Sequence, residues 1–333
     1  MKRIIFVSLT LLLAAGLIAG CKGRSGKAEK TVGTVRIASF YNTLIESSAI
    51  AKSQGFFEEE LEKVGFKPEY STFAQAGPAL NEALAVKAID FGMYADFPQL
   101  VLFDKGVNVR VIAPVTTASH YGIIAGTNSG IKTPKDLEGK KVIVPKGTIL
   151  QKVFEDVVEE YGLDINKIQQ LNAVADQLSV YSSGEADAVV ATAFTMLVLQ
   201  SQSGGEIVFS TLNKPEWSTV VTVVGRGEFL DQNPDVAKAL IRALYRAYEY
   251  AQGNKEGAFQ ALATELSPPP LIAELYSFDT SFSYFKPEFT DADIAKVDSV
   301  NTFLFEQKLI AQKVDLNKFI DRSYYEAVKA EFK

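Results

Sequence analysis

The chain has 333 residues, of which 47% are hydrophobic, so it is not an intrinsically disordered protein and has room for about two domains with cores of their own. Its formal net charge of −6, without a stripe of basic residues, excludes a typical nucleic-acid binder. One histidine and one cysteine leave almost no material for a zinc site or a Cys–His catalytic pair. We therefore expect no metal and no cofactor.

The N-terminus predicts a signal peptide over residues 1–20. Lys2 and Arg3 precede an apolar run that ends in small residues, and Cys21 follows directly. The Ile-Ala-Gly-Cys stretch resembles the bacterial lipoprotein signal, in which this cysteine is acylated and becomes the first mature residue. The alternative is a buried thiol. Residues 21–33 are rich in Gly, Lys and Ser and predict a flexible, lipid-anchored tether.

From residue 34 on, short apolar runs alternate with helical patterns. Helices are expected at residues 45–53, 79–86, 150–161 and 177–183. Strands are expected, mostly as the continuous apolar runs of buried parallel sheets, at residues 35–39, 89–93, 109–115, 121–126, 141–145, 187–192, 206–210 and 219–224. This alternation predicts an α/β fold with helices on both faces of its sheet.

One internal similarity suggests how the chain divides. Residues 82–98 and 179–195 each contain a helix end, a tight turn, a buried strand and a new helix start. Two such units favour two similar lobes, although two βα units can also resemble each other by chance. After about residue 227 the pattern contains only helices.

The C-terminal part predicts a helical block that packs on the first lobe. Pro234 suits the first position of a long helix with one apolar face, and Asn233 or Asp231 can cap its start. The Ser-Pro-Pro-Pro stretch at residues 267–270 interrupts the helices, and residues 291–306 form the clearest later one.

Five segments, spread in order over the chain, support a family assignment: AKSQGFFEEEL, EALAVKAIDFG, IKTPKDLEGKKVIVPKGT, SSGEADAVV and EFLDQNPDVAKAL. With them, residues 35–330 resemble the periplasmic solute-binding proteins of ABC importers for aliphatic sulfonates, taurine and nitrate. Thiamine-pyrimidine precursor proteins belong to the same superfamily. The resemblance implies a two-lobed periplasmic binding protein fold (type II-like), with a ligand cleft between the lobes and the C-terminal helical block.

The resemblance also implies domains and partners. Residues 34–115 and 218–333 would form lobe 1, and residues 116–217 lobe 2, with crossings near residues 115–119 and 216–220. The protein would be no enzyme but an exported, membrane-anchored monomer that faces the periplasm or the outside of the cell. It would pass a small solute to an ABC permease in the cytoplasmic membrane.

Ligands of open α/β sheets bind beyond the carboxyl ends of strands, where helix starts present unpaired N–H groups. Two glycine-containing turns, one in each expected lobe, fit this pattern. In the first, Gly77 follows Gln75 and permits close approach, while Pro78 suits the first helical position. In the second, the hydroxyl of Thr148 and the ammonium of Lys146 flank Gly147. Both turns suit an oxyanion, and each is also explained by an ordinary capped helix.

Asp96 follows a third strand. It is an obvious helix N-cap, and it would also place a carboxylate in the cleft, where it would match the ammonium of a zwitterion such as taurine. Further candidates have ordinary structural explanations as well, such as capping or core packing: Asn42, Phe97, Thr117, Ser119, His120, Thr192 and Trp217.

The sequence therefore favours a lipid-anchored receptor for a small anionic or zwitterionic solute, similar to a sulfonate or taurine. Alternatives are a receptor for a thiamine-pyrimidine-like heterocycle, with Trp217 or Phe97 stacking on it, an enzyme on the same fold, or a scaffold lipoprotein without a solute. No G-x-S-x-G, Walker or dinucleotide-binding motif supports an enzyme.

Overall fold

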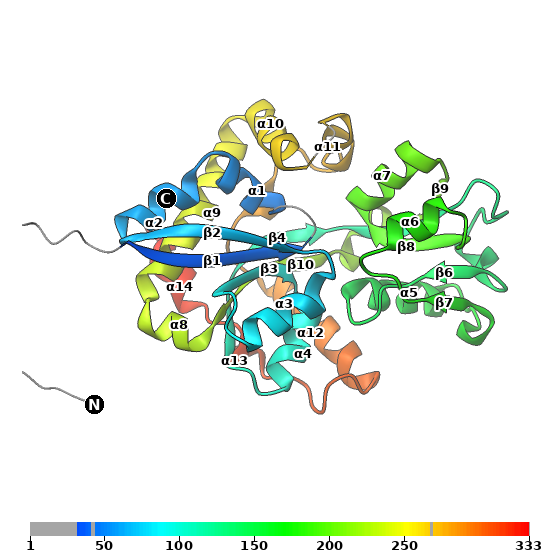
Figure 1. The fold of residues 1–333 in the computed structure, drawn as a ribbon, viewed down its shortest axis with the longest axis horizontal. Helices are drawn as coiled ribbons and strands as arrows, with labels where there is room; N and C mark the ends of the chain where they lie inside the picture. Colours follow the sequence, from blue (N-terminus) through cyan, green and yellow to red (C-terminus); the bar gives the residue numbers. More distant parts are fainter. Residues whose placement is uncertain (1–31, 41–43, 267–268, 333) are drawn as a thin grey trace, which may run out of the picture. The chain divides into compact units, whose positions relative to one another are not determined.

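The structure of the chain is a computed structural model, which describes residues 32–40, 44–266 and 269–332 (Figure 1). The predicted signal peptide, Cys21, nearly all of the predicted tether and Asn42 lie outside the described residues. No helix in the described part is both long and apolar enough to span a bilayer.

Sheet A has five strands within the described residues. Its order is β2 (Phe66–Phe73), β1 (Gly33–Phe40), β3 (Phe91–Ala95), β10 (Thr219–Arg226) and β4 (Val109–Ser119). The strand β1 runs parallel to β2 and β3, with Ile37 opposite both Tyr70 and Phe91. By contrast, β10 runs antiparallel to both of its neighbours. A strand from much later in the chain, β10, therefore lies inside the sheet between β3 and β4.

Sheet B also has five strands in the described part. Its order is β7 (Gln169–Leu171), β6 (Lys141–Ile143), β8 (Ala188–Thr192), β5 (Tyr121–Ala125) and β9 (Glu206–Ser210). Parallel pairing joins β6 to β7 and β8, whereas β5 is antiparallel to β8 and β9. The expectation of parallel strands is thus wrong for β4, β5, β9 and β10, because apolar runs report burial on both faces and not strand direction.

Two groups of helices pack on sheet A (Figure 1). The first group surrounds α9 and comprises α1 (Glu46–Ser53), α2 (Phe56–Lys63), α8 (Gly227–Gln232), α9 (Pro234–Gly253), α10 (Lys255–Glu265) and α14 (Ser323–Lys329). The second group comprises α3 (Ala76–Ala85), α4 (Asp96–Asp104) and α12 (Asp291–Glu306). The C-terminal helices therefore pack on the sheet that contains the N-terminal strands, as the sequence predicts.

The remaining helices pack on sheet B or lie outside these two groups. On sheet B lie α5 (Ile149–Glu160), α6 (Gln177–Ser182) and α7 (Ala193–Ser203), and α11 (Pro269–Leu275) contacts α7 and α10. A short α13 (Leu316–Phe319) contacts β4. Single 3₁₀ turns are η1 (Pro134–Leu137), η2 (Ile165–Lys167), η3 (Thr211–Asn213), η4 (Pro215–Trp217) and η5 (Ser283–Phe285).

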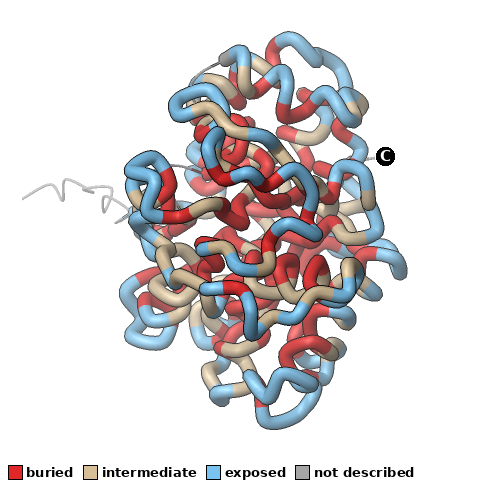
Figure 2. Tube along the Cα trace, turned by 90° about the vertical axis from the view of Figure 1, so that its right-hand side faces the viewer, coloured by how far each residue is buried: buried red, intermediate tan, exposed pale blue. Residues whose placement is uncertain are grey.

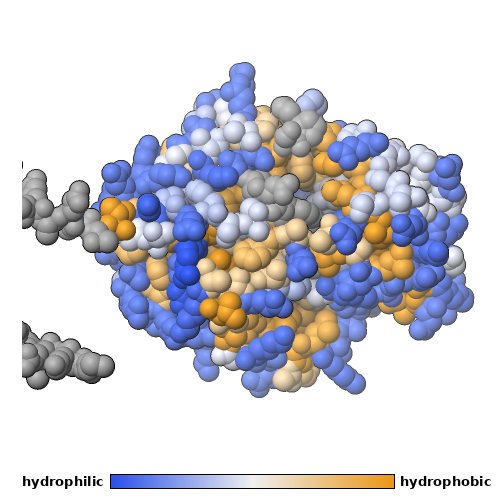
Figure 3. All heavy atoms as spheres, in the orientation of Figure 1, coloured by the Kyte–Doolittle hydropathy of each residue, from blue (hydrophilic) through white to orange (hydrophobic). Residues whose placement is uncertain are grey.

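The buried residues follow the strands and the inner faces of the helices (Figure 2). One of the buried charged residues is Asp90: it forms ion pairs with Arg36 of β1 and Arg226 of β10, and its own side chain is only 2% exposed. The two guanidinium groups hold the pKa of Asp90 below its ordinary value despite its burial. Hydrophilic residues cover much of the face in Figure 3, with hydrophobic residues exposed in patches between them.

Each of the two repeated units that the sequence indicates lies in a different sheet. In sheet A the unit is α3–β3–α4, and in sheet B it is α6–β8–α7. The long helix α9 begins at Pro234 as predicted, and Asn233 occupies its N-cap position, but the side chain of neither proposed residue makes a capping hydrogen bond. The side-chain amide of Asn233 donates to the carbonyl oxygen of Phe229, and the carboxylate of Asp231 pairs with Arg110.

Two segments of the chain link the sheets. Only His120 separates β4 from β5, and residues 211–218 connect β9 to β10. Lys296 of α12 joins the two links, because its Nζ donates to the carbonyl oxygen of Thr117 at 2.6 Å and to Oγ of Ser218 at 3.0 Å. The first link directly follows residues 115–119, and the second overlaps residues 216–220, the two regions in which crossings were predicted.

Candidate functional site

A pocket lies beyond the carboxyl ends of strands from both sheets. Its walls follow β1, β2 and β3 of sheet A and β6, β7 and β8 of sheet B, and its cavity volume is about 50 Å³. This first pocket is lined by Phe40, Ala74, Ala76, Gly77, Tyr94, Ala95, Pro98, Tyr121, Pro145, Thr148, Ile149, Leu150, Val174, Gln177 and Thr192. Such a position is where α/β sheets bind small ligands.

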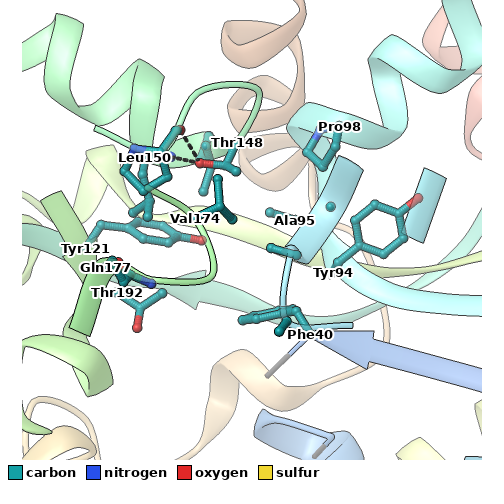
Figure 4. A pocket seen from close by; sticks show the side chains of 15 residues that line it. Phe40, Tyr94, Ala95, Pro98, Tyr121, Thr148, Leu150, Val174, Gln177 and Thr192 are labelled. Carbon is teal, nitrogen blue, oxygen red and sulfur yellow. Dashed lines mark hydrogen bonds between the residues drawn. The ribbon is translucent and has the colours of Figure 1, made fainter. Parts of the chain in front are cut away.

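The walls of the first pocket are mostly apolar. Figure 4 shows Tyr121, Gln177 and Thr192 on one side, and Phe40, Ala95 and Pro98 across from them. Among the described residues that line it, none carries a charge. Its walls therefore suit the apolar or aromatic body of a solute.

The hydroxyl groups of the pocket are already engaged in hydrogen bonds. Thr148 caps α5: its Oγ1 donates to the carbonyl oxygen of Pro145 at 2.8 Å and accepts from the amide of Leu150 at 3.2 Å (Figure 4). Thr192 caps α7 through the amide of Thr195. Because both threonine side chains act as helix caps, the polar groups left for a ligand include backbone N–H groups near the helix starts.

The first turns of three helices reach the first pocket. They belong to α3, at Ala76 and Gly77, to α4, at Pro98, and to α5, at Ile149 and Leu150. Pro98 has no N–H group, and the amide of Leu150 already donates to Thr148, so the start of α3 and Ile149 are where backbone donors can face the pocket. No side chain of the described residues caps α3 or α4. Unpaired N–H groups and the partial positive charge of a helix start attract anions, so the pocket combines apolar walls with oxyanion-compatible ends.

Asp96, the first residue of α4, lies behind this pocket and not on its wall. Its side chain is fully buried, and neither carboxylate oxygen has a hydrogen-bond partner among the described residues. The amides of Asp96 and Phe97 lie near and lower its pKa, but without hydrogen-bond geometry. Burial has the larger effect and raises the pKa to about 7. The predicted N-cap is wrong, because the cap position is Ala95 and Asp96 makes no capping bond.

A second pocket adjoins the first and shares Phe40 and Thr192 with it. Its described lining residues are Phe40, Ile45, Glu46, Ala118, Ser119, His120, Thr192, Ala193, Phe194, Leu266, Leu275, Tyr276 and Phe278. His120 is 7% exposed, with Nδ1 at 3.1 Å from Oγ1 of Thr211 and its ring edge-on to Phe278. Burial and the charge of Lys296 lower the pKa of His120 to about 4, so its imidazole is neutral near pH 7.

The structure brings some of the predicted site residues together. Gly77, Thr148 and Thr192 line the first pocket, and Ser119, His120 and Thr192 line the second. Both glycine-containing turns thus belong to elements around one pocket. The helix of the first turn begins at Ala76, however, so Pro78 is its third residue and not its first.

The other predicted residues lie elsewhere. Phe97, Lys146 and Gly147 line a separate groove beside α3 and α4. Gln75 is exposed, and the carbonyl oxygen of Thr117 accepts a hydrogen bond from Lys296. Trp217 packs against Phe209 and under the ammonium of Lys214, 4.6 Å from its ring centre, and lines neither pocket.

Sequence reasoning missed most of the wall. Tyr94, Tyr121, Pro145 and Val174 stand at or near strand ends, so the position of each along the chain could have indicated it, whereas Gln177 is the first residue of α6. Their residue types could not, because they are ordinary core or turn residues. No group of three or more His, Cys, Asp or Glu residues that could hold a metal ion occurs in the described ranges.

This architecture, two α/β sheets with a pocket beyond the strand ends, is the periplasmic binding protein fold. The structure superimposes on the periplasmic sulfonate-binding protein SsuA of Methylobacillus flagellatus KT with a TM-score of 0.74 and 24% identity, covering 91% of this chain and 96% of that one. The pattern of the NMT1/THI5-like family matches residues 43–258. The chain belongs to this family.

Two relatives show how varied the similar proteins are. A protein of Bacillus subtilis (strain 168) that carries the name of an aliphatic sulfonates-binding protein is 25% identical over 323 residues, 95% of this chain and 94% of its own length. A 4-amino-5-hydroxymethyl-2-methylpyrimidine phosphate synthase of Legionella pneumophila is 22% identical over 294 residues, 84% of this chain and 89% of its own. Both binding proteins and an enzyme are therefore similar to this chain.

Proposed function

We propose that this protein is the solute-binding component of an ABC importer and that the first pocket captures a small oxyanion with an apolar body, such as an alkanesulfonate. The observation that carries the proposal is the meeting of the uncapped start of α3, at Ala76 and Gly77, with apolar walls in one pocket. The helix starts suit the oxyanion, and the side chains of Phe40, Leu150 and Val174 suit the apolar body.

The importer role is supported by the relatives. The SsuA protein with this fold is described as part of a sulfonate ABC transporter, and the Bacillus relative bears a sulfonate-binding name. We infer that the chain is exported, that lipid on Cys21 holds it at the outer side of a membrane, and that it delivers its solute to the permease as a monomer.

Lipid attachment has a direct test. Replacing the only thiol, Cys21→Ser, should leave the precursor uncleaved at this point and unlabelled by radioactive palmitate in growing cells. Normal labelling of the variant would refute the anchor without affecting the binding proposal.

We further propose that residues 34–115 with 218–333, and residues 116–217, act as two lobes that close on the solute. The two linking segments and the pocket walls from both sheets support this view. Small-angle X-ray scattering with and without a bound sulfonate should show a smaller radius of gyration in the complex. Equal radii in both states would contradict closure.

One observation favours a second candidate. No lysine or arginine is among the described residues that line the first pocket, whereas the aromatic residues Phe40, Tyr94 and Tyr121 are. Aromatic walls without a cation also suit an uncharged heterocycle, and the Legionella relative is named for a pyrimidine. An enzyme on this fold is the third candidate, for which the first pocket offers no charged acid–base group among its described residues.

Calorimetric titration separates these candidates. The probes are hexane-1-sulfonate, hexan-1-ol as its uncharged counterpart, and 4-amino-2-methylpyrimidine. The proposal predicts that the sulfonate binds at least tenfold more tightly than the alcohol, because charged hydrogen bonds contribute about 1.5–3 kcal/mol each. Binding of the pyrimidine alone would establish the second candidate in place of the first.

Thr148→Ala is the matched variant for this titration. Because both hydrogen bonds of the Thr148 hydroxyl stay within the protein, this substitution should lower the free energy of unfolding by about 1 kcal/mol and change sulfonate affinity by less than threefold. A large loss of affinity would mean that the hydroxyl contacts the solute.

A further inference from the structure

The second pocket contains a carboxylate that the proposed function does not use. Glu46 is the first residue of α1 and faces this pocket. Its Oε2 accepts a hydrogen bond from the hydroxyl of Tyr276 at 3.0 Å. No lysine or arginine is among the described residues that line the pocket, so Glu46 is the one charged group on that wall.

The surroundings of Glu46 are apolar and aromatic. Phe40, Phe194 and Phe278 line the pocket with it, and the single histidine present, His120, is neutral near pH 7. Burial raises the pKa of Glu46 to about 7, against the opposing effect of the Tyr276 hydroxyl. A carboxylate in such a place lacks the counter-charge that enclosed ionised groups ordinarily have.

The backbone at Glu46 is strained. Its φ is +55°, the left-handed region that a residue with a side chain rarely adopts. Directly after it, Oγ of Ser47 donates to the carbonyl oxygen of Val115 at 2.6 Å, which ties the start of α1 to β4. Strain of this kind persists where the surrounding structure enforces it, and it is concentrated at ligand sites.

We propose that the second pocket binds a positively charged nitrogen group, a primary ammonium or an amidinium, with Glu46 as its counter-ion. The aromatic rings beside Glu46 suit such a cation, because ring faces attract positive charge. The inference rests on the proposed function, since the two pockets share Phe40 and Thr192 and one ligand could occupy both. Glu46 thereby takes the role that the sequence suggests for Asp96, which lines neither pocket.

Three probes of one length test the two pockets separately. They are butane-1-sulfonate, 4-aminobutane-1-sulfonate and butylammonium, titrated calorimetrically into the full chain. The wild type should bind the aminosulfonate at least tenfold more tightly than the plain sulfonate, as a charge-assisted hydrogen bond allows. Glu46→Gln should abolish this preference and leave the affinity for the plain sulfonate within twofold.

Two further variants control the result. Asp96→Asn neutralises the other buried carboxylate near the first pocket and should keep the preference. Tyr276→Phe removes the hydroxyl that donates to Glu46 and should keep or strengthen it. The near-ultraviolet circular dichroism of each variant shows whether it is folded, and if Glu46→Gln does not fold, the comparison of the two sulfonates in the wild type still tests the cation site.

The outcomes separate this inference from the proposed function. Equal affinities for the two sulfonates in the wild type, or a preference that survives Glu46→Gln, would overturn the cation site and leave the oxyanion proposal intact. Binding of butylammonium that depends on Glu46, without binding of the plain sulfonate, would support the cation site and refute the oxyanion. Binding of none of the three probes would refute both.

Discussion

Asp96→Asn should make the protein more stable at pH 8 and less stable at pH 4. The Asp96 carboxylate is fully buried and has no hydrogen-bond partner in the described part of the chain, and burial raises its pKa from 3.8 to about 7 in the folded state. The folded protein therefore binds a proton that the unfolded chain releases, so stability decreases as the pH rises from about 4 to about 7. At about 1.4 kcal/mol per pH unit, the decrease is about 4 kcal/mol.

Asparagine removes this decrease but adds a buried amide. The amide donors cost about 1–3 kcal/mol if they find no acceptor. The variant should thus be about 1–3 kcal/mol less stable than the wild type at pH 4 and about 1–3 kcal/mol more stable at pH 8. Urea unfolding of both proteins across this pH range measures the difference.

Asp291→Asn is the matched control, because Asp291 is also the first residue of a helix, α12, but is exposed. Its replacement should cost less than about 1 kcal/mol at either pH, the usual size of a helix-end charge effect. If the stability curves of wild type and Asp96→Asn run parallel from pH 4 to pH 8, Asp96 does not titrate between them and the reasoning from its burial is refuted.

Two further predictions concern the pocket wall and the links between the sheets. In Gly77→Ala the new Cβ would lie 2.3 Å from Cγ of Pro98, so we expect about 1–3 kcal/mol of lost stability and weaker solute binding. The control is Gly253→Ala, whose new Cβ would have no described atom within 4 Å and should change neither property. Equal melting temperatures for both variants would contradict the clash. Lys296→Met removes both hydrogen bonds that join the two linking segments, so hydrogen exchange measured by mass spectrometry should become faster in residues 115–121 and 211–219. Unchanged exchange in these residues would show that the two bonds are not needed to keep the segments ordered.

The regular elements with strong patterns could be predicted from the sequence. Residues 206–210 and 291–306 coincide with β9 and α12. Strand β2 was missed because Pro68 interrupts it and because Lys67 and Glu69 are exposed, as an edge strand allows. Strand β7 has three residues, too few for a periodic signal. Strand direction was not predictable, since the partners of β10 lie more than a hundred residues earlier in the chain.

The site could be predicted in its location but not in its chemistry. Strand ends and glycine turns led to Gly77 and Thr148, which line the same pocket, while their contact with a solute stays a prediction. The same reasoning placed Asp96 and Trp217 in the cleft, because neighbours along the chain do not reveal which way a side chain faces. Glu46 was not predicted, because in the sequence it looks like an ordinary acidic residue in a first helical turn. Only its tertiary contact with Tyr276 distinguishes it.

The place of β10 in sheet A fixes an order of assembly. Strand β4 pairs with β10 and with no other strand of the described sheet, so it has no partner in sheet A until Thr219–Arg226 is available. Sheet B, by contrast, needs only residues 121–210. When the chain emerges N-terminus first, sheet B can therefore be completed before sheet A, in which a strand edge stays exposed until β10 is available. Such an edge is prone to aggregation, and a chaperone that binds the emerging chain would be most useful in this interval.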